Sequence, residues 1–207
     1  GRQRITVAQT KGKRVLLVNP PGNIHWVPIA LSYLKSNIPS QHEVKLLDCT
    51  ALNINGDSRA FREVLDNFKP DIVGVSTLTS TVGQSLDVLK TCKAHMPGTT
   101  TIMGGTHPTV YPEDVLRNDA CDFVLRGEAE MSFPLFIDVL GQPDFYKKVS
   151  GLGYRTGEGI QLNDIHWEDN LDAMKYPDYS SILGLGWLDE GSSHYGVKVP
   201  LWLTRGC

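Results

Sequence analysis

Short apolar stretches alternate with amphipathic ones from residue 14 onward, and each kind predicts its own element. Apolar runs of strand length occur at residues 14–19, 43–48, 71–76, 99–103 and 122–125. Apolar residues recur at helical spacing after these runs, at residues 27–38, 58–68, 82–95, 112–116 and 128–140. Strands that are apolar on both faces and alternate with helices are typical of a parallel sheet covered on both sides.

This order predicts an α/β protein with a doubly wound, five-stranded parallel sheet, because right-handed crossovers place helices on both of its faces. In such folds, ligands bind beyond the carboxyl ends of the strands, near the point where the strand order reverses. We therefore expect the loops after the first, third and fourth strands to carry the function.

The pattern changes after residue 141. Two apolar segments, 149–155 and 160–163, flank Thr156-Gly157-Glu158-Gly159, and this arrangement predicts a C-terminal β-hairpin. Residues 170–183 are irregular and polar, which is typical of a connector. Residues 199–204 are apolar again and predict one more strand.

The composition is that of an ordinary globular protein, with 41% hydrophobic and 21% charged residues and a net charge of −3. Nucleic acids and anionic membranes usually recruit a basic patch, so neither is an expected partner. No apolar run approaches the roughly 20 residues that span a bilayer, and the polar N-terminus is not a secretory signal. Scattered cysteines without a C-x-x-C pair favour the reducing cytoplasm over a disulfide framework.

The loop after the first strand begins with Asn19-Pro20-Pro21-Gly22. Its prolines pre-set a turn, and it contains neither G-x-x-x-x-G-K-S nor G-x-G-x-x-G, so binding of a nucleotide phosphate is disfavoured. A rigid turn between a strand and a helix explains this loop equally well.

The next two candidate loops carry hydroxyls and glycines. The loop after the third strand is Ser76-Thr77-Leu78-Thr79-Ser80-Thr81. One hydroxyl suffices to cap the following helix, which leaves several to hydrogen-bond a polar ligand. The loop after the fourth strand is Gly104-Gly105-Thr106-His107-Pro108-Thr109, whose paired glycines permit either close approach of a ligand or an ordinary turn.

A Ser-x-Leu sequence after the third strand and Gly-Gly after the fourth resemble the cobalamin-binding domains of methionine synthase and the methylmalonyl mutases. The resemblance implies that the cleft for the dimethylbenzimidazole tail is formed by Ser76, Leu78, Gly104 and Gly105. Those families carry Asp-x-His-x-x-Gly after the first strand, and its histidine ligates cobalt from below. This chain has no such sequence there, and His25 lies at the wrong spacing, so the lower axial ligand stays unassigned.

Further strings, in the same order along residues 14–207, resemble cobalamin-dependent radical S-adenosylmethionine (radical SAM) enzymes. They are Asn19-Pro20-Pro21, residues 104–109, 122–130 and 151–155, and the connector sequences 170–172 and 176–179. In that family, Gly-Glu-x-Glu ends the fifth strand and matches Gly127, Glu128 and Glu130. These carboxylates would contact the corrin amides, or they would only favour the start of a helix.

The resemblance implies a set of cofactor-binding residues on four loops. They are Asn19, Pro20, Pro21, Ser76, Thr77, Leu78, Thr79, Gly104, Gly105, Thr106, His107, Gly127 and Glu128. It also implies an N-terminal tail over residues 1–13, a cobalamin-binding domain over 14–142, a hairpin and connector over 143–198, and the start of a radical SAM domain over 199–207.

The final residues, Leu201-Trp202-Leu203-Thr204-Arg205-Gly206-Cys207, resemble the opening of a radical SAM domain. Such a domain holds a 4Fe-4S cluster with Cys-x-x-x-Cys-x-x-Cys, and Cys207 would be its first thiolate. The other two thiolates are absent. The cluster and SAM are therefore expected only in a longer parent protein, of which this chain is a fragment or an ordered part.

By this resemblance, the chain is the cobalamin-binding module of a cytoplasmic methyltransferase that uses methylcobalamin and SAM on a small-molecule substrate. Its partner would be its own radical SAM domain, and it would contain no catalytic residue itself. Some relatives use cobalamin for ring closure or contraction instead. Two other classes stay open, namely a non-catalytic cobalamin carrier or sensor and a flavodoxin-like domain that binds another ligand or a partner protein.

Overall fold

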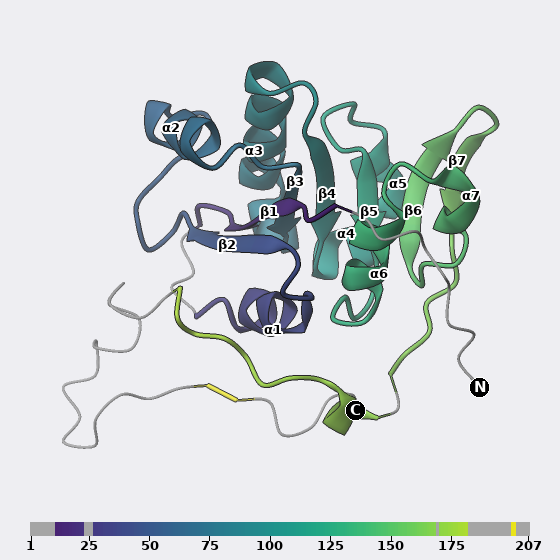
Figure 1. Ribbon diagram of the computed structural model, residues 1–207. Coiled ribbons are helices and arrows are strands. Elements are labelled where there is room, and N and C mark those ends of the chain that lie inside the picture. The colour runs from purple at the N-terminus through teal and green to yellow at the C-terminus, as the bar shows by residue number, and fades with distance from the viewer. Residues whose placement is uncertain (1–10, 23–26, 169, 182–199, 202–207) are drawn as a thin grey trace.

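The computed structural model describes residues 11–22, 27–168, 170–181 and 200–201. Its centre is one mixed sheet with the strand order β2-β1-β3-β4-β5-β6-β7 (Figure 1). The first five strands pair in parallel, and β6 and β7 pair antiparallel. The strands are β1 (Arg14–Asn19), β2 (Glu43–Asp48), β3 (Ile72–Ser76), β4 (Thr100–Gly104), β5 (Phe123–Leu125), β6 (Leu152–Thr156) and β7 (Gly159–Leu162).

The helices lie in two layers on either side of this sheet (Figure 1). Residues of α1, α6 and α7 form one core with the sheet, and residues of α2, α3 and α5 form the other. The helices are α1 (Ile29–Asn37), α2 (Arg59–Phe68), α3 (Val82–His95), α4 (Thr106–Val110), α5 (Pro112–Leu116), α6 (Ser132–Val139) and α7 (Pro143–Tyr146), with the 3-10 turns η1 (Thr79–Thr81) and η2 (Leu171–Ala173).

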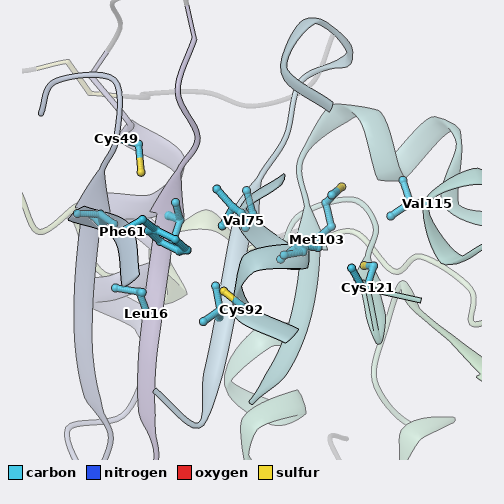
Figure 2. Packing of buried hydrophobic residues seen from close by; sticks show 14 of the residues in the cluster. Leu16, Cys49, Phe61, Val75, Cys92, Met103, Val115 and Cys121 are labelled. Atoms are coloured by element: carbon cyan, nitrogen blue, oxygen red, sulfur yellow. The ribbon is translucent and has the colours of Figure 1, made fainter. Parts of the chain in front are cut away.

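Neighbouring residues of one strand enter different cores, because side chains of a strand alternate between the two faces of the sheet. Leu17 of β1 packs in the core of α1 and α6, whereas Leu16 packs in the core of α2 and α3. Figure 2 shows the second core, in which Phe61 of α2 and Cys92 of α3 lie over the strands. The uninterrupted apolar runs of the sequence thus supply both faces at once.

The expected fold class is confirmed, but the sheet has seven strands rather than five. The two additional strands are the expected hairpin, which extends the sheet because β6 pairs with β5 and places Tyr154 opposite Phe123. An isolated two-stranded hairpin is marginally stable in water, and without β6 the edge of β5 that faces away from β4 would expose unpaired backbone groups. Pairing with β5 therefore stabilises the hairpin and gives the backbone groups at that edge of β5 their hydrogen-bond partners.

Short helices occupy segments that the sequence pattern left as loops. α4 lies within the expected loop after β4 and includes Pro108. Proline is tolerated there because the first N–H groups of a helix have no partner within it. α6 begins at Ser132, four residues after the expected start at residue 128.

Some sequence expectations lie outside the described residues. They concern His25, Cys207, most of the N-terminal tail and most of the apolar run 199–204. Of the helices that the structure describes, none is long and apolar enough to cross a membrane.

Candidate functional site

A cavity of about 370 Å³ lies between the sheet and the helices α1 and α6. Most of its walls are apolar, with three carboxyl- or hydroxyl-bearing side chains among them, as is usual for sites that bind small molecules and cofactors. The lining residues are Leu17, Ala30, Leu31, Leu34, Gly74, Val75, Ser76, Ile102, Gly104, Gly105, Leu125, Gly127, Glu128, Ala129, Glu130 and Phe133.

Three small residues in the carboxyl-terminal halves of two neighbouring strands leave the space for this cavity. Gly74 and Ser76 are alternate residues of β3, and Ser76 lies opposite Gly104 of β4. Alternation therefore directs all three positions to the face covered by α1 and α6. None of them carries a side chain long enough to fill the gap between sheet and helices.

Gly74 marks the floor of the cavity. A Cβ atom at this position would lie 3.4 Å from Leu17 Cδ2, 3.5 Å from Ile102 Cγ2 and 3.7 Å from Phe133 Cζ. These are ordinary contact distances, so the backbone tolerates a methyl group there. A longer side chain at residue 74 would extend into the cavity and occupy it.

The paired glycines at the carboxyl end of β4 have different structural roles. A Cβ atom on Gly104 would meet only Leu125 O, at 3.6 Å, so Gly104 keeps the cavity open. Gly105 has a φ of 99°, and a Cβ atom there would lie 2.7 Å from Thr77 O and 2.8 Å from Thr77 N. Gly105 is thus required where the loops after β3 and β4 cross at close range.

Most of the hydroxyls after β3 have structural partners. Thr77 is fully buried and donates a 2.9 Å hydrogen bond to Ser85 Oγ of α3, on the face away from the cavity. Thr81 Oγ1 accepts a 3.2 Å bond from Leu78 N. Of the hydroxyl-bearing residues in this loop, Ser76 lines the cavity, whereas Thr79 and Ser80 are exposed outside it.

The acidic residues after β5 lie at the cavity wall. Glu128 and Glu130 both line it, and Glu130 is only 6% exposed. Both have interactions within the protein. Both residues precede the first turn of α6, which itself contains no acidic residue.

Gly127, two residues after the end of β5, has a φ of 74° and donates its N–H to Thr109 Oγ1 at 3.0 Å. A Cβ atom on Gly127 would lie 2.8 Å from Ile165 Cγ2 in the segment after β7. The glycine therefore allows this segment to pass directly beside the cavity.

The other implied cofactor-binding residues lie outside the cavity lining. Asn19 donates a 2.9 Å hydrogen bond to Asp48 Oδ1, and the Pro20 carbonyl accepts one from Thr50, so these residues join two loops. His107 Nδ1 lies 3.3 Å from Thr79 Oγ1. The residues in this group are Asn19, Pro20, Pro21, Thr77, Leu78, Thr79, Thr106 and His107.

Several apolar side chains are exposed in the segments that follow the carboxyl ends of β3, β4 and β5. They are Leu78, Val110, Tyr111 and Met131, with exposed fractions of 46%, 59%, 50% and 38%. The rings of Tyr111 and His107 lie 5.4 Å apart. We call these four side chains the apolar rim.

Sequence reasoning missed the helix residues of the cavity and its floor. Leu31 and Leu34 of α1 and Phe133 of α6 read as ordinary core positions, because only packing against the sheet places them at a cavity. Gly74 did carry a signal, since a glycine inside a strand often marks the close approach of a ligand or another backbone.

The described cysteines are structural. Burial raises the pKa of the Cys49, Cys92 and Cys121 thiols to about 12, so they stay protonated and are poor metal ligands at neutral pH. Within the described ranges, no three histidine, cysteine or acidic side chains gather in a way that could hold a metal ion.

The fold and the cavity define a doubly wound α/β domain with a largely apolar cavity near the carboxyl ends of its strands, which is where such folds bind their ligands. A model of the B12-binding domain family matches residues 13–137, which is more than half of the chain. The chain belongs to this family, which confirms the cobalamin-binding class expected from the sequence.

Three similar proteins extend this comparison. An uncharacterized methyltransferase of Pyrococcus horikoshii is 30% identical over 207 residues, covering 95% of this chain and 44% of the relative. The cobalamin-dependent S-adenosylmethionine radical enzyme OxsB, with aqua-cobalamin and S-adenosylmethionine bound, has a TM-score of 0.71 at 20% identity, covering 84% of this chain and 25% of OxsB. The radical S-adenosylmethionine methyltransferase TsrM from Kitasatospora setae, with cobalamin and a 4Fe-4S cluster bound, has a TM-score of 0.60 at 19% identity, covering 74% of this chain and 31% of TsrM.

The two solved structures share the fold of this chain. In each of the three comparisons, the chain spans less than half of the length of the similar protein.

Proposed function

We propose that this chain is the cobalamin-binding module of a longer radical SAM enzyme, and that the cavity receives the nucleotide tail of cobalamin. The observation that carries the proposal is the gap left by Gly74, Ser76 and Gly104, within a domain that belongs to the B12-binding family. A tail bearing an aromatic base fits an apolar cavity that opens at the carboxyl ends of the strands.

Each part of the site has its own task in this proposal. The apolar walls remove the base of the tail from water, and the Ser76 hydroxyl offers one hydrogen bond near the ends of β3 and β4. The apolar rim and His107 support the lower face of the corrin ring. The protein thereby binds and orients the cofactor and excludes water around it.

The proposed activity of the longer protein is methyl transfer to a small molecule. Bound cobalamin would supply the methyl group, while a second domain with a 4Fe-4S cluster and SAM would generate a radical on the substrate. Cys207 would be the first cluster thiolate. The methyltransferase relative and the two solved radical SAM enzymes support this assignment. Three buried free thiols support a cytoplasmic location.

A cavity-filling variant tests the placement of the tail. In Gly74→Leu, the new side chain extends into the cavity, and we expect the whole protein to lose at least about 100-fold in affinity for cobalamin, measured by equilibrium dialysis with detection of corrin absorbance. Gly83→Leu is the matched control, because no atom lies within 4 Å of a Cβ atom at that helical position. Unchanged affinity in a folded Gly74→Leu protein would exclude the tail from this cavity.

The activity is tested separately on the whole protein supplied with cobalamin, SAM and a reductant. Formation of 5′-deoxyadenosine is the expected result for a radical SAM enzyme. A protein that binds cobalamin tightly and cleaves no SAM would instead be a cobalamin carrier or sensor.

A further inference from the structure

The cavity differs chemically between its mouth and its inner end. Gly74 and Ile102 lie opposite each other, two residues before Ser76 and Gly104 along their strands. Two residues of a strand span about 6.6 Å, so the first pair lies that much deeper below the carboxyl edge. The mouth therefore has a side-chain hydroxyl, whereas the side chains around the floor deeper in are only hydrocarbon.

The helices close the inner end with hydrocarbon as well. α1 runs back from the carboxyl edge of the sheet, so Leu34 lies about one turn deeper than Ala30. The ring of Phe133, which comes from α6, packs over Gly74 from the helix side of the cavity. Leu17 completes this inner end beside Gly74.

The polar side chains of the lining are few and mostly engaged. Glu128 and Glu130 already interact with other groups of the protein, and Ser76 lies at the mouth. A base that reaches the inner end therefore meets Leu17, Leu34 and Phe133, and no described side chain there can donate or accept a hydrogen bond.

We propose that this cavity selects corrinoids by their lower base, and that it prefers an apolar base such as dimethylbenzimidazole over a purine. This inference rests on the proposed function, because it requires the tail to enter the cavity. A purine carries several ring nitrogens and, in adenine, an exocyclic amine, and each loses its hydrogen bonds to water at the inner end. Dimethylbenzimidazole instead presents two methyl groups to the same hydrocarbon surface.

The test compares three corrinoids on the whole protein, namely cobalamin, the cobamide with adenine as lower base, and cobinamide, which has no base. All three are used in their dicyano forms, in which no lower base is bound to cobalt, so that differences in affinity arise from the protein. We expect cobalamin to bind about 10- to 100-fold more tightly than the adenine cobamide. Equal affinities, or tighter binding of the adenine cobamide, would overturn the selectivity.

Cobinamide separates this inference from the proposed function. If cobinamide binds as tightly as cobalamin, or if none of the three corrinoids binds, the tail does not use the cavity and the proposed function itself fails. If cobalamin binds more tightly than cobinamide but equally with the adenine cobamide, only the selectivity is lost.

A pair of variants at one inner position sharpens the test. Leu34→Gln places an amide at the inner end, and we expect the preference for cobalamin over the adenine cobamide to fall at least about 5-fold, since the amide can pair with purine nitrogens. Leu34→Met keeps the position apolar at similar volume and should retain the preference. An unchanged ratio in a folded Leu34→Gln protein would place the base elsewhere.

Discussion

The two faces of the sheet are built by alternate residues of the same strands, and one face is filled by side chains while the other keeps a cavity. On the face of α2 and α3, Leu16, Val73 and Met103 are fully buried, and helix side chains such as Phe61 fill the space above them (Figure 2). On the face of α1 and α6, small residues interrupt the same strands near their carboxyl ends and a cavity remains. The cavity therefore depends on small side chains in the strands as much as on the loops around it.

Aromatic truncation tests the difference between a filled and an open face, and it has the largest expected effect. Phe61→Ala should lower the free energy of unfolding by about 3–5 kcal/mol, because it removes a fully buried ring from a close-packed core. Phe133→Ala should cost less, since its ring already borders open space. Urea denaturation of both variants measures the difference, and an equal or larger loss for Phe133→Ala would contradict it.

The two glycines at the carboxyl end of β4, Gly104 and Gly105, allow a second test. Gly105→Ala should lower the free energy of unfolding by about 2–3 kcal/mol, because an alanine at that φ is strained and its Cβ meets the backbone of Thr77. Gly104→Ala should be neutral or stabilise the protein by up to about 1 kcal/mol, since its position is open. Thermal and urea unfolding check both values. Similar losses of unfolding free energy in the two variants would show that the two glycines do not differ in their structural roles.

Ser76 and Thr77 are adjacent but serve opposite faces, which predicts a smaller difference. Thr77→Val leaves the buried Ser85 hydroxyl without its partner and should cost about 1–2 kcal/mol of unfolding free energy. Ser76→Ala should change stability by less than about 0.5 kcal/mol but weaken cobalamin binding, because this hydroxyl lines the cavity. Unfolding and binding are measured on both proteins. A binding loss confined to Thr77→Val would reverse the assignment.

The face that contains the cavity also differs in how its helix α1 is held in place. The connector runs along the outside of α1 (Figure 1), where Lys35 pairs with Asp178 at 3.0 Å and Asp178 N donates to Ser32 O. Partial burial tends to raise the pKa of the Asp178 carboxyl, but hydrogen bonds from Ser180 and Lys35, together with the Lys35 charge, hold that pKa below its ordinary value. The connector thus supports from outside a wall that the cavity leaves unsupported from inside.

The smallest expected effect comes from this ion pair. Since the folded-state pKa of Asp178 is lowered, its stabilisation is present above the ordinary carboxyl pKa and is lost as the pH falls through the folded value. Asp178→Asn should therefore cost less than about 1 kcal/mol near neutral pH, and the difference from the unmodified protein should vanish in acid. Asp87→Asn, on the exposed side of α3, is the control. Urea midpoints across this pH range provide the measurement, and a pH-independent difference would contradict the assignment.

The sequence by itself determined the order of the elements and most of their bounds. Uninterrupted apolar runs required strands buried on both faces, and the alternation with helices required a parallel, doubly wound sheet. The resemblance also directed attention to Ser76, Gly104, Gly105, Gly127 and Glu128, and the structure places all five at the cavity wall. Their role in binding a cofactor stays a prediction. Strand ends and loop sequences can be found in this way because they are local features.

Only the tertiary structure decided which residues share one cavity. Strand alternation places Ser76 and Thr77 on opposite faces, but the packing of α1 and α6 determines which face stays open. The hairpin likewise had a recognisable sequence, yet its pairing with β5 depends on an edge that exists only in the folded sheet. Such choices depend on contacts between segments far apart in the chain, and no local pattern of residues carries that information.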